Sequence, residues 1–136
     1  MEKYFYFVIT PNAKIYRAES IHSRILKLDE LQKAVQGYIE TVRSQSDELN
    51  CTPYKVIGLV NEEGRLQGLA DNPIGSMVLS YPVPLCGNVV ILQVDGEELI
   101  GFNEKEADAI GRHIYHTRNL YAGYFSPGDG GALQCC

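Results

Sequence analysis

The fold is decided by the stretch LDELQKAVQGYIETVRSQSDELNCTPYKVIGLVNEEGRLQGLADNPIGSM, residues 28–77, which begins with an amphipathic pattern. The first part predicts a helix, because apolar residues recur with the 3.6-residue period of one helical face: Leu31, Val35, Tyr38, Ile39 and Val42. Asp29 suits the first turn, where a carboxylate favours the positive end of the helix dipole. Gly37 would then lie inside the helix at a cost of about 1 kcal/mol against alanine, which indicates close approach by another group.

The middle of this block predicts two strands joined by a tight turn. Residues 44–50 are polar and indicate a loop, whereas 54–60 are rich in β-branched and aromatic residues and indicate a strand. Asn61–Gly64 predicts the turn, with Gly64 able to take a positive φ. We expect residues 65–68 to return as a short antiparallel strand.

Outside the block, four further strands are indicated. Residues 4–9 are aromatic and β-branched and predict a first strand, and residues 14–17 suit a short second one. The apolar run 89–94 ends at Asp95-Gly96, a strong turn signal, and residues 99–102 would pair back onto it.

Two other helices have clear start signals. Asn72 followed by Pro73 is a cap with proline at the first helical position, and it predicts a brief helix. Asn103 with Glu106 three residues later matches a capping box. The core stripe behind this box predicts a last helix that reaches about Thr117: Ala107, Ile110 and Ile114.

These elements predict an α+β fold with a small mixed or antiparallel sheet, two main helices and one short helix. The chain of 136 residues matches one domain, which we place at residues 1–125. The glycine-rich end, residues 126–136, predicts a flexible tail.

Charge and cysteine content limit the function. A net charge of −5 argues against non-specific binding to nucleic acid, where neutralisation of phosphates dominates affinity. Cys51 and Cys86 each stand alone in segments that look like strands, which is typical of buried free thiols. No apolar run approaches the ~20 residues that span a membrane, and no signal peptide is evident. We therefore expect a protein of a reducing cytosol with no membrane association.

No arrangement of residues predicts catalysis, and we expect neither a cofactor nor a metal. His113 and His116 could share a helical face, but two imidazoles alone do not fix a metal ion. Cys86 lacks a sequence context for a nucleophile. Glu62 and Glu63 lie in a predicted turn, where charge is usually solvated. The sequence therefore favours a protein that is not an enzyme.

The last helix carries the most suggestive cluster. It contains four positive or protonatable residues, Arg112, His113, His116 and Arg118, with Tyr115, Tyr121 and Tyr124 among and after them. Positive groups beside aromatic rings suit a phosphate together with a stacked base. The other interpretation is an amphipathic helix with a basic outer face and with tyrosines that pack at its end.

Four short motifs resemble domain of unknown function family 3846, and together they cover roughly residues 25–112. They are LDELQKAVQGYIE at 28–40, NEEG at 61–64 followed by Gly68-Leu69 and Asn72, CGNVV at 86–90, and GFN at 101–103. The resemblance implies a small protein of the phages, plasmids or integrative elements of bacteria, and hence the cytosol of a bacterial host. It implies no activity.

Two functions remain open. The first is a mobile-element protein that binds a small anionic, nucleotide-like ligand and so sequesters a host defence signal. Its candidate binding residues are Tyr38, Asn61, Asn72, Arg112, His116, Arg118 and Tyr121. The alternative is an acidic, non-catalytic module that inhibits a host enzyme or regulator through protein–protein contact. A homodimer is also expected if the aromatic first strand is a sheet edge.

Overall fold

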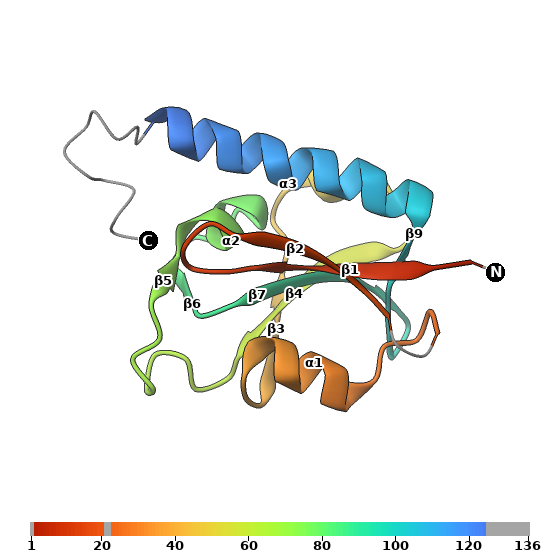
Figure 1. The fold of residues 1–136 in the computed structure, drawn as a ribbon, viewed down its shortest axis with the longest axis horizontal. Helices are drawn as coiled ribbons and strands as arrows, with labels where there is room; N and C mark the ends of the chain where they lie inside the picture. The colour runs from red at the N-terminus through yellow and green to blue at the C-terminus, as the bar shows by residue number, and fades with distance from the viewer. Residues whose placement is uncertain (1, 21–22, 125–136) are drawn as a thin grey trace.

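The computed structural model describes residues 2–20 and 23–124, which form an antiparallel sheet between helices on both of its faces. Figure 1 shows α3 and α2 on one side of the sheet and α1 on the other. The strands are β1 Tyr4–Ile9, β2 Ile15–Glu19, β3 Ile39–Arg43, β4 Lys55–Asn61, β5 Asp71–Asn72, β6 Leu85–Cys86, β7 Val89–Asp95, β8 Glu98–Ile100 and β9 Phe102–Asn103. The helices are α1 Leu28–Val35, the 3-10 turn η1 Asp47–Leu49, α2 Pro73–Val78 and α3 Glu104–Tyr124. The predicted α+β class is confirmed.

The main sheet runs in the order β2-β1-β7-β4-β3 and divides near its middle. The first half of β7 pairs with β1, and its second half pairs with β8. β9 continues from β8 and pairs with the start of β1. β1 is therefore an interior strand covered by β2, so the argument for a homodimer from an exposed aromatic edge is wrong.

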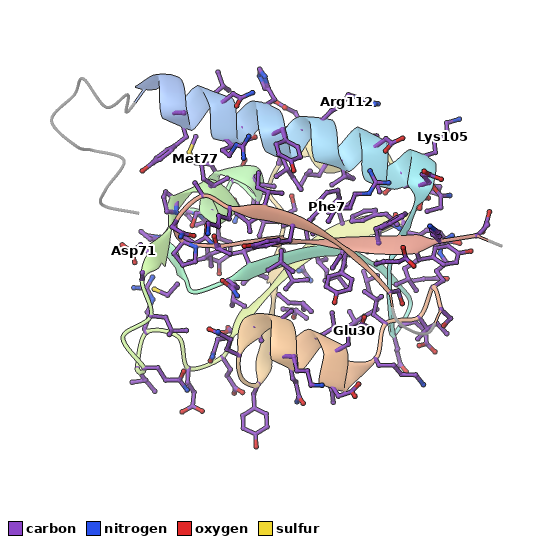
Figure 2. All side chains as sticks on the ribbon, viewed as in Figure 1. Phe7, Glu30, Asp71, Met77, Lys105 and Arg112 are labelled. Atoms are coloured by element: carbon purple, nitrogen blue, oxygen red, sulfur yellow. The ribbon has the colours of Figure 1, made fainter. Side chains whose placement is uncertain are left out.

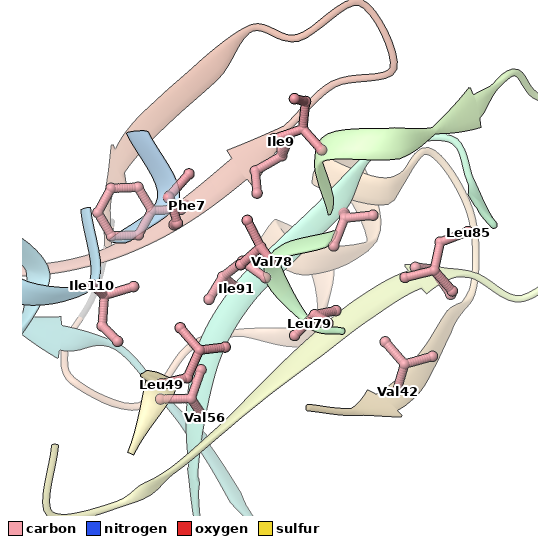
Figure 3. Close-up of a cluster of buried hydrophobic side chains, with 14 of the residues drawn as sticks. Phe7, Ile9, Val42, Leu49, Val56, Val78, Leu79, Leu85, Ile91 and Ile110 are labelled. Atoms are coloured by element: carbon pink, nitrogen blue, oxygen red, sulfur yellow. The ribbon is translucent and has the colours of Figure 1, made fainter. Parts of the chain in front are cut away.

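Alternation along the strands divides the apolar residues between two cores. Phe7, Ile9 and Ile91 face α2 and α3, where the rings of Phe7 and Phe102 lie 6.1 Å apart. Figure 3 shows this larger core, with Ile110 of α3 and Val78 of α2 against the sheet. The smaller core lies under α1 and is made by Tyr6, Leu26, Leu31, Val35, Ile57, Leu59, Val90 and Leu92.

The first helix is shorter than the sequence predicts, and this is the main correction. α1 ends at Val35, Gln36 adopts the left-handed conformation with φ 63°, and the Gly37 N–H donates to the carbonyl of Gln32. Residues 39–43 form β3 and pair with β4. Ile39 and Val42 thus point to opposite faces of a sheet, and Tyr38 is exposed. The close approach expected at Gly37 is confirmed, although not inside a helix.

The predicted strand 65–68 is also wrong. Residues 62–68 are turns in which the Gly68 N–H bonds to the carbonyl of Arg65. Gly68, not Gly64, has the positive φ. The chain pairs again only at β5, whose partner is β6.

The remaining predictions divide between confirmations and smaller corrections. Strands 4–9, 54–60 and 89–94 and the start of α2 at Asn72 are confirmed. The polar loop 44–50 contains the turn η1, and Cys51 is exposed and lies outside any strand. α3 continues past Thr117 to Tyr124. The predicted tail 126–136, with Cys135 and Cys136, lies outside the described residues.

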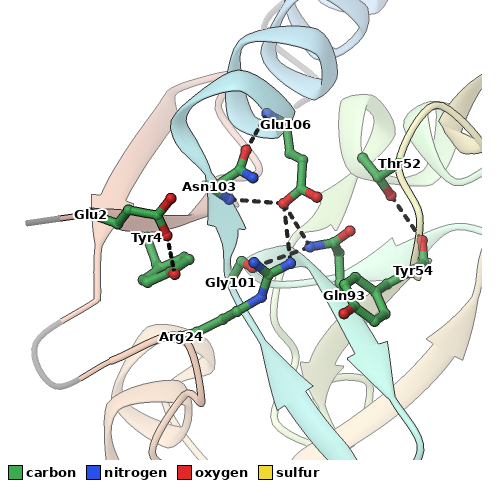
Figure 4. Close-up of polar contacts among 9 residues, drawn as sticks. All are labelled: Glu2, Tyr4, Arg24, Thr52, Tyr54, Gln93, Gly101, Asn103 and Glu106. Atoms are coloured by element: carbon green, nitrogen blue, oxygen red, sulfur yellow. Dashed lines mark hydrogen bonds and ion pairs between the residues drawn. The ribbon is translucent and has the colours of Figure 1, made fainter.

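The start of α3 is fixed by a polar cluster around Glu106 (Figure 4). The Asn103 N–H donates to Glu106 Oε1 at 2.9 Å, and the Glu106 N–H donates to Asn103 Oδ1 at 2.8 Å, which confirms the capping box. Glu106 Oε1 also accepts from Gln93 Nε2 at 3.3 Å and lies 3.4 Å from Arg24 Nη2. This cluster anchors the helix that carries the candidate site.

Candidate functional site

An open groove of about 600 Å³ runs beside α3, on the side that faces β2. Its walls come from one strand residue on each of β1 and β2 and from successive turns of α3. The lining residues are Phe7, Arg17, Ala107, Asp108, Gly111, Arg112, Tyr115, His116 and Asn119.

Small residues on α3 form the floor of this groove. Ala107 and Gly111 are one turn apart and both buried. A Cβ on Gly111 would lie 3.2 Å from Phe7 Cζ, a tight contact that the ring or the helix would have to relieve by a small shift. Glycine therefore lets the helix rest directly on that ring. Figure 2 shows Phe7 beneath α3 and Arg112 on the outer side of the helix.

Two cationic or protonatable side chains on the groove are available to a ligand. Arg112 and His116 lie one turn apart on α3 and are exposed. Neither forms an ion pair or a side-chain hydrogen bond with another described residue. Arg17, by contrast, already has its Nη1 2.7 Å from Asp108 Oδ1, and its guanidinium lies 4.3 Å from the centre of the Phe5 ring. The groove therefore has free positive charge at one end and a neutralised pair at the other.

Arg118 acts on the groove only indirectly. Its guanidinium lies 4.8 Å from the centre of the Tyr115 ring, three residues earlier on α3. Such a cation–π contact restrains the ring. Tyr115 itself lines the groove and is partly exposed.

The structure separates the other predicted binding residues from Arg112 and His116. Tyr121 is buried in the larger core, and Tyr38 is exposed where the chain enters β3 at the far edge of the sheet. Asn61 is buried at the end of β4, where its Nδ2 donates to the carbonyl of Gln36 at 3.1 Å and its Oδ1 accepts from the Glu63 N–H at 2.8 Å.

Asn72 is fully buried, and its side chain is occupied by the fold. Its Nδ2 donates to the carbonyls of Ile9 and Gly87 at 2.7 and 2.8 Å, while its Oδ1 accepts from the Gly75 N–H at 2.9 Å. The amide thereby ties α2 to β1 and to the turn before β7. Both donors and the acceptor have partners inside the protein.

Other titratable side chains considered from the sequence have structural partners. His113 Nδ1 lies 3.1 Å from Glu48 Oε2, so this histidine packs α3 against η1 and does not join His116 in the groove. Burial and a hydrogen bond from its thiol to Asp71 raise the pKa of Cys86, which disfavours a reactive thiolate. Among residues 2–20 and 23–124, no three His, Cys, Asp or Glu side chains are placed to hold a metal ion.

Sequence reasoning missed the part of the groove that comes from the sheet. Arg17 pairs with Phe7 across β1 and β2, so their side chains share one face of the sheet. The period-two alternation of β2 indicates which residues share a face with Arg17. Nothing local to β2 says that this face meets α3, because that contact joins residues 91 positions apart.

Comparison with known proteins gives a family but no function. The model of the family "Domain of unknown function (DUF3846)" matches residues 4–114. This is most of the chain, and the protein therefore belongs to that family. No curated protein and no solved structure matches it. Within the described residues, no helix is both long and apolar enough to cross a membrane.

Proposed function

We propose that this protein binds a small anionic, nucleotide-like ligand in the groove between α3 and β2. The observation that carries the proposal is the placement of Arg112 and His116 one turn apart on the exposed wall of that groove, without partners among the described residues. Phosphate oxygens suit such a pair, because a guanidinium offers a planar fork of N–H donors and an imidazole adds one more.

The aromatic side of the groove suits a flat ring attached to the anionic group of the ligand. Tyr115 presents a ring that Arg118 restrains from outside the groove. A base stacked on an aromatic side chain contributes about 1–3 kcal/mol to binding. An anionic group with an attached flat ring therefore fits this wall better than an inorganic anion alone.

The same geometry supports binding without turnover. Asp108, the carboxylate that lines the groove, is held by Arg17 at 2.7 Å. In the phage or plasmid setting of the proposal, the ligand is a nucleotide signal of the bacterial host, kept from its receptor by sequestration.

The experiment is a thermal-unfolding screen with inorganic pyrophosphate, ADP and cyclic di-AMP, followed by calorimetric titration of any compound that stabilises the protein. A ligand at a hundred times its dissociation constant adds about 2.7 kcal/mol to the free energy of unfolding. We expect the two nucleotides to stabilise the protein more than pyrophosphate does. Absence of stabilisation by all three compounds at millimolar concentration would contradict the proposal.

The matched variants test the location. Arg112→Gln with His116→Gln should remove the stabilisation by nucleotide while leaving the unliganded protein as stable as before, since both side chains are exposed. Lys105→Gln removes an exposed cation from the same helix outside the groove and should have no effect on binding. Figure 2 shows Lys105 near the start of α3 and Arg112 further along it.

A further inference from the structure

A second groove, of about 190 Å³, lies at the opposite edge of the sheet from β2. Its floor is apolar and comes from β3, β4 and β6, through Val42, Val60 and Leu85. The segment 81–86 forms the facing wall. None of the residues of the α3 groove takes part, so this site is independent of the proposed anion site.

Large apolar side chains stand exposed at the rim of this second groove. Leu66 is 87% exposed and Val83 is 49% exposed. Met77, 43% exposed, lies in an adjoining hollow that shares Val83 with the groove. Scattered exposed leucines are ordinary, but apolar side chains gathered around a hollow with a polar rim are typical of protein-binding surfaces.

The charge on the rim is negative. Glu40 and Glu62 both line the groove and are exposed, and neither is paired with a described cation. They are neighbours because of the register between β3 and β4, in which Glu40 lies opposite Val60. Glu62 follows Val60 by two residues, so its side chain is on the same face as that of Glu40. The cation among the lining residues is Arg65, whose Nη2 donates to the carbonyl of Pro84 at 2.6 Å. Two carboxylates against one guanidinium leave the groove net negative.

β3 beside this groove is an edge strand. Within the described chain it pairs only with β4. The Glu62 N–H donates to the carbonyl of Tyr38 at 2.8 Å. In an antiparallel pair every second residue bonds to the neighbouring strand, so the backbone groups of Glu40 and Val42 also point toward β4. The backbone groups of Ile39, Thr41 and Arg43 therefore point outward, while the side chains of Glu40 and Val42 face the groove.

We propose that β3 receives an extended segment of a partner protein, which pairs with it as an added strand and places basic and apolar side chains alternately in the second groove. A lysine or arginine opposite Glu40 and Glu62 would neutralise the rim. An apolar residue two positions away would cover Val42 and contact Val83. Backbone pairing supplies affinity and the alternate side chains supply specificity, as in other cases of strand addition.

The other edge, β2, does not offer the same combination. The face of β2 that meets α3 carries Arg17, which is already paired with Asp108. A basic segment added there would meet the positive charge of Arg112 close by. The chemistry of the two edges thus assigns the basic segment to β3.

The test uses a synthetic peptide of about seven residues in which lysine and valine alternate on one side and threonine fills the other. Amide hydrogen exchange followed by NMR should show slower exchange at Thr41 and Arg43 when this peptide is present, and no slowing on β2. A peptide with glutamate in place of lysine should bind more weakly. Equal protection by both peptides, or no protection at β3, would overturn the proposal.

Variants of the protein separate the two parts of the interaction. Glu40→Gln with Glu62→Gln should weaken binding of the lysine peptide about fivefold, the size expected for two exposed ion pairs. Glu19→Gln with Glu98→Gln removes as much charge from elsewhere on the sheet and should leave the affinity unchanged. Thr41→Pro removes an outward N–H without removing a bond to β4 and should abolish protection. If that variant does not fold, the glutamine pairs decide: equal effects of the two pairs would overturn the assignment to β3.

Discussion

The side-chain amide of Asn61 lies directly against Gly37, so that a Cβ on Gly37 would be 2.6 Å from Asn61 Nδ2. That amide donates to the carbonyls of Val35 and Gln36 at 3.3 and 3.1 Å. The last residues of α1 are therefore capped by a side chain from the end of β4, and the glycine leaves room for it. With this contact α1 ends at Val35 and β3 begins at Ile39, although the apolar residues continue at helical spacing as far as Val42.

Gly37→Ala should lower the free energy of unfolding by about 1–3 kcal/mol, the usual cost of overpacking a site that cannot yield. The sign is informative, because alanine inside a helix would instead stabilise by about 1 kcal/mol. Urea denaturation measures it. Gly123→Ala is the control, since it lies in α3 with nothing within 4 Å of the added Cβ, and it should be neutral or stabilising. A gain in stability from Gly37→Ala would contradict the observed end of α1.

Gln36→Gly should stabilise the protein by about 0.5–1 kcal/mol. Gln36 is an exposed residue held at φ 63°, a conformation that costs a residue with a side chain about 1–2 kcal/mol. Glycine removes this strain, but it also raises the entropy of the unfolded chain, which offsets part of the stabilisation. Its carbonyl remains available to Asn61. Thermal and urea unfolding should agree on the sign, and Gln32→Gly, one turn earlier inside α1, should destabilise.

The segment 36–42 shows where sequence reasoning fails and why. Its apolar residues fit a helical period and a strand alternation about equally well over so short a run. The deciding facts are the contact with Asn61, which lies 26 positions from Val35, and the pairing of residues 39–43 with β4. Both join segments that are distant in the sequence. Local signals that carry their own geometry, such as Asn72 before Pro73, predict correctly.

The candidate site likewise combines features that local sequence predicts with features that depend on tertiary contacts. Helical spacing alone places Arg112 near His116, because residues four apart share a face. Burial of Tyr121 and the internal hydrogen bonds of Asn61 and Asn72 depend on tertiary contacts. Nothing in the sequence near Tyr121 or Asn61 reveals that the ring and the amide are turned inward. At Asn72 the sequence predicts the cap but not the two carbonyls to which the amide also donates.

The capping box at the start of α3 should show strong coupling. Asn103→Ala should cost about 1 kcal/mol, the usual value for a lost cap. Glu106→Ala should cost about 2–3 kcal/mol, because it also leaves Gln93 and Arg24 without their shared acceptor. The double variant should lose less than the sum, because both bonds hold the same first turn of α3 and the loss of either lets that turn fray and weakens the other. Additive losses in urea denaturation would show that the two bonds act independently of each other.

Stability should fall at high pH because of Tyr6. Burial raises the pKa of Tyr6 from 10.0 to about 12, and the negative charge of Glu30 and the hydrogen bond to its carboxylate contribute to the same shift. The folded state therefore holds the phenol proton more tightly than the unfolded chain does. The resulting stabilisation is complete below about pH 10 and is lost as the pH rises toward about 12.

Tyr6→Phe tests this linkage, because phenylalanine has no proton to lose. The difference in free energy of unfolding between wild type and variant should shrink steadily over that pH range, as measured by urea denaturation at each pH. Tyr16→Phe removes an exposed hydroxyl and is the matched control. A constant difference between wild type and Tyr6→Phe from pH 9 to 12 would show that Tyr6 does not titrate differently in the folded state.

Arg112 and Arg118 should contribute unequally to the proposed anion site. Arg112 lines the groove, so Arg112→Ala removes a direct phosphate contact and should weaken nucleotide binding about tenfold or more. Arg118 contacts the ring of Tyr115 from outside, at 4.8 Å, so Arg118→Ala should weaken binding only about two- to threefold, through a less restrained ring. Calorimetric titration with ADP measures both, with Lys105→Ala as the control. The loss from Arg118→Ala should also disappear in a Tyr115→Ala background, where no ring is left to restrain. A larger loss from Arg118→Ala than from Arg112→Ala would place the phosphate on the other side of Tyr115, outside the groove.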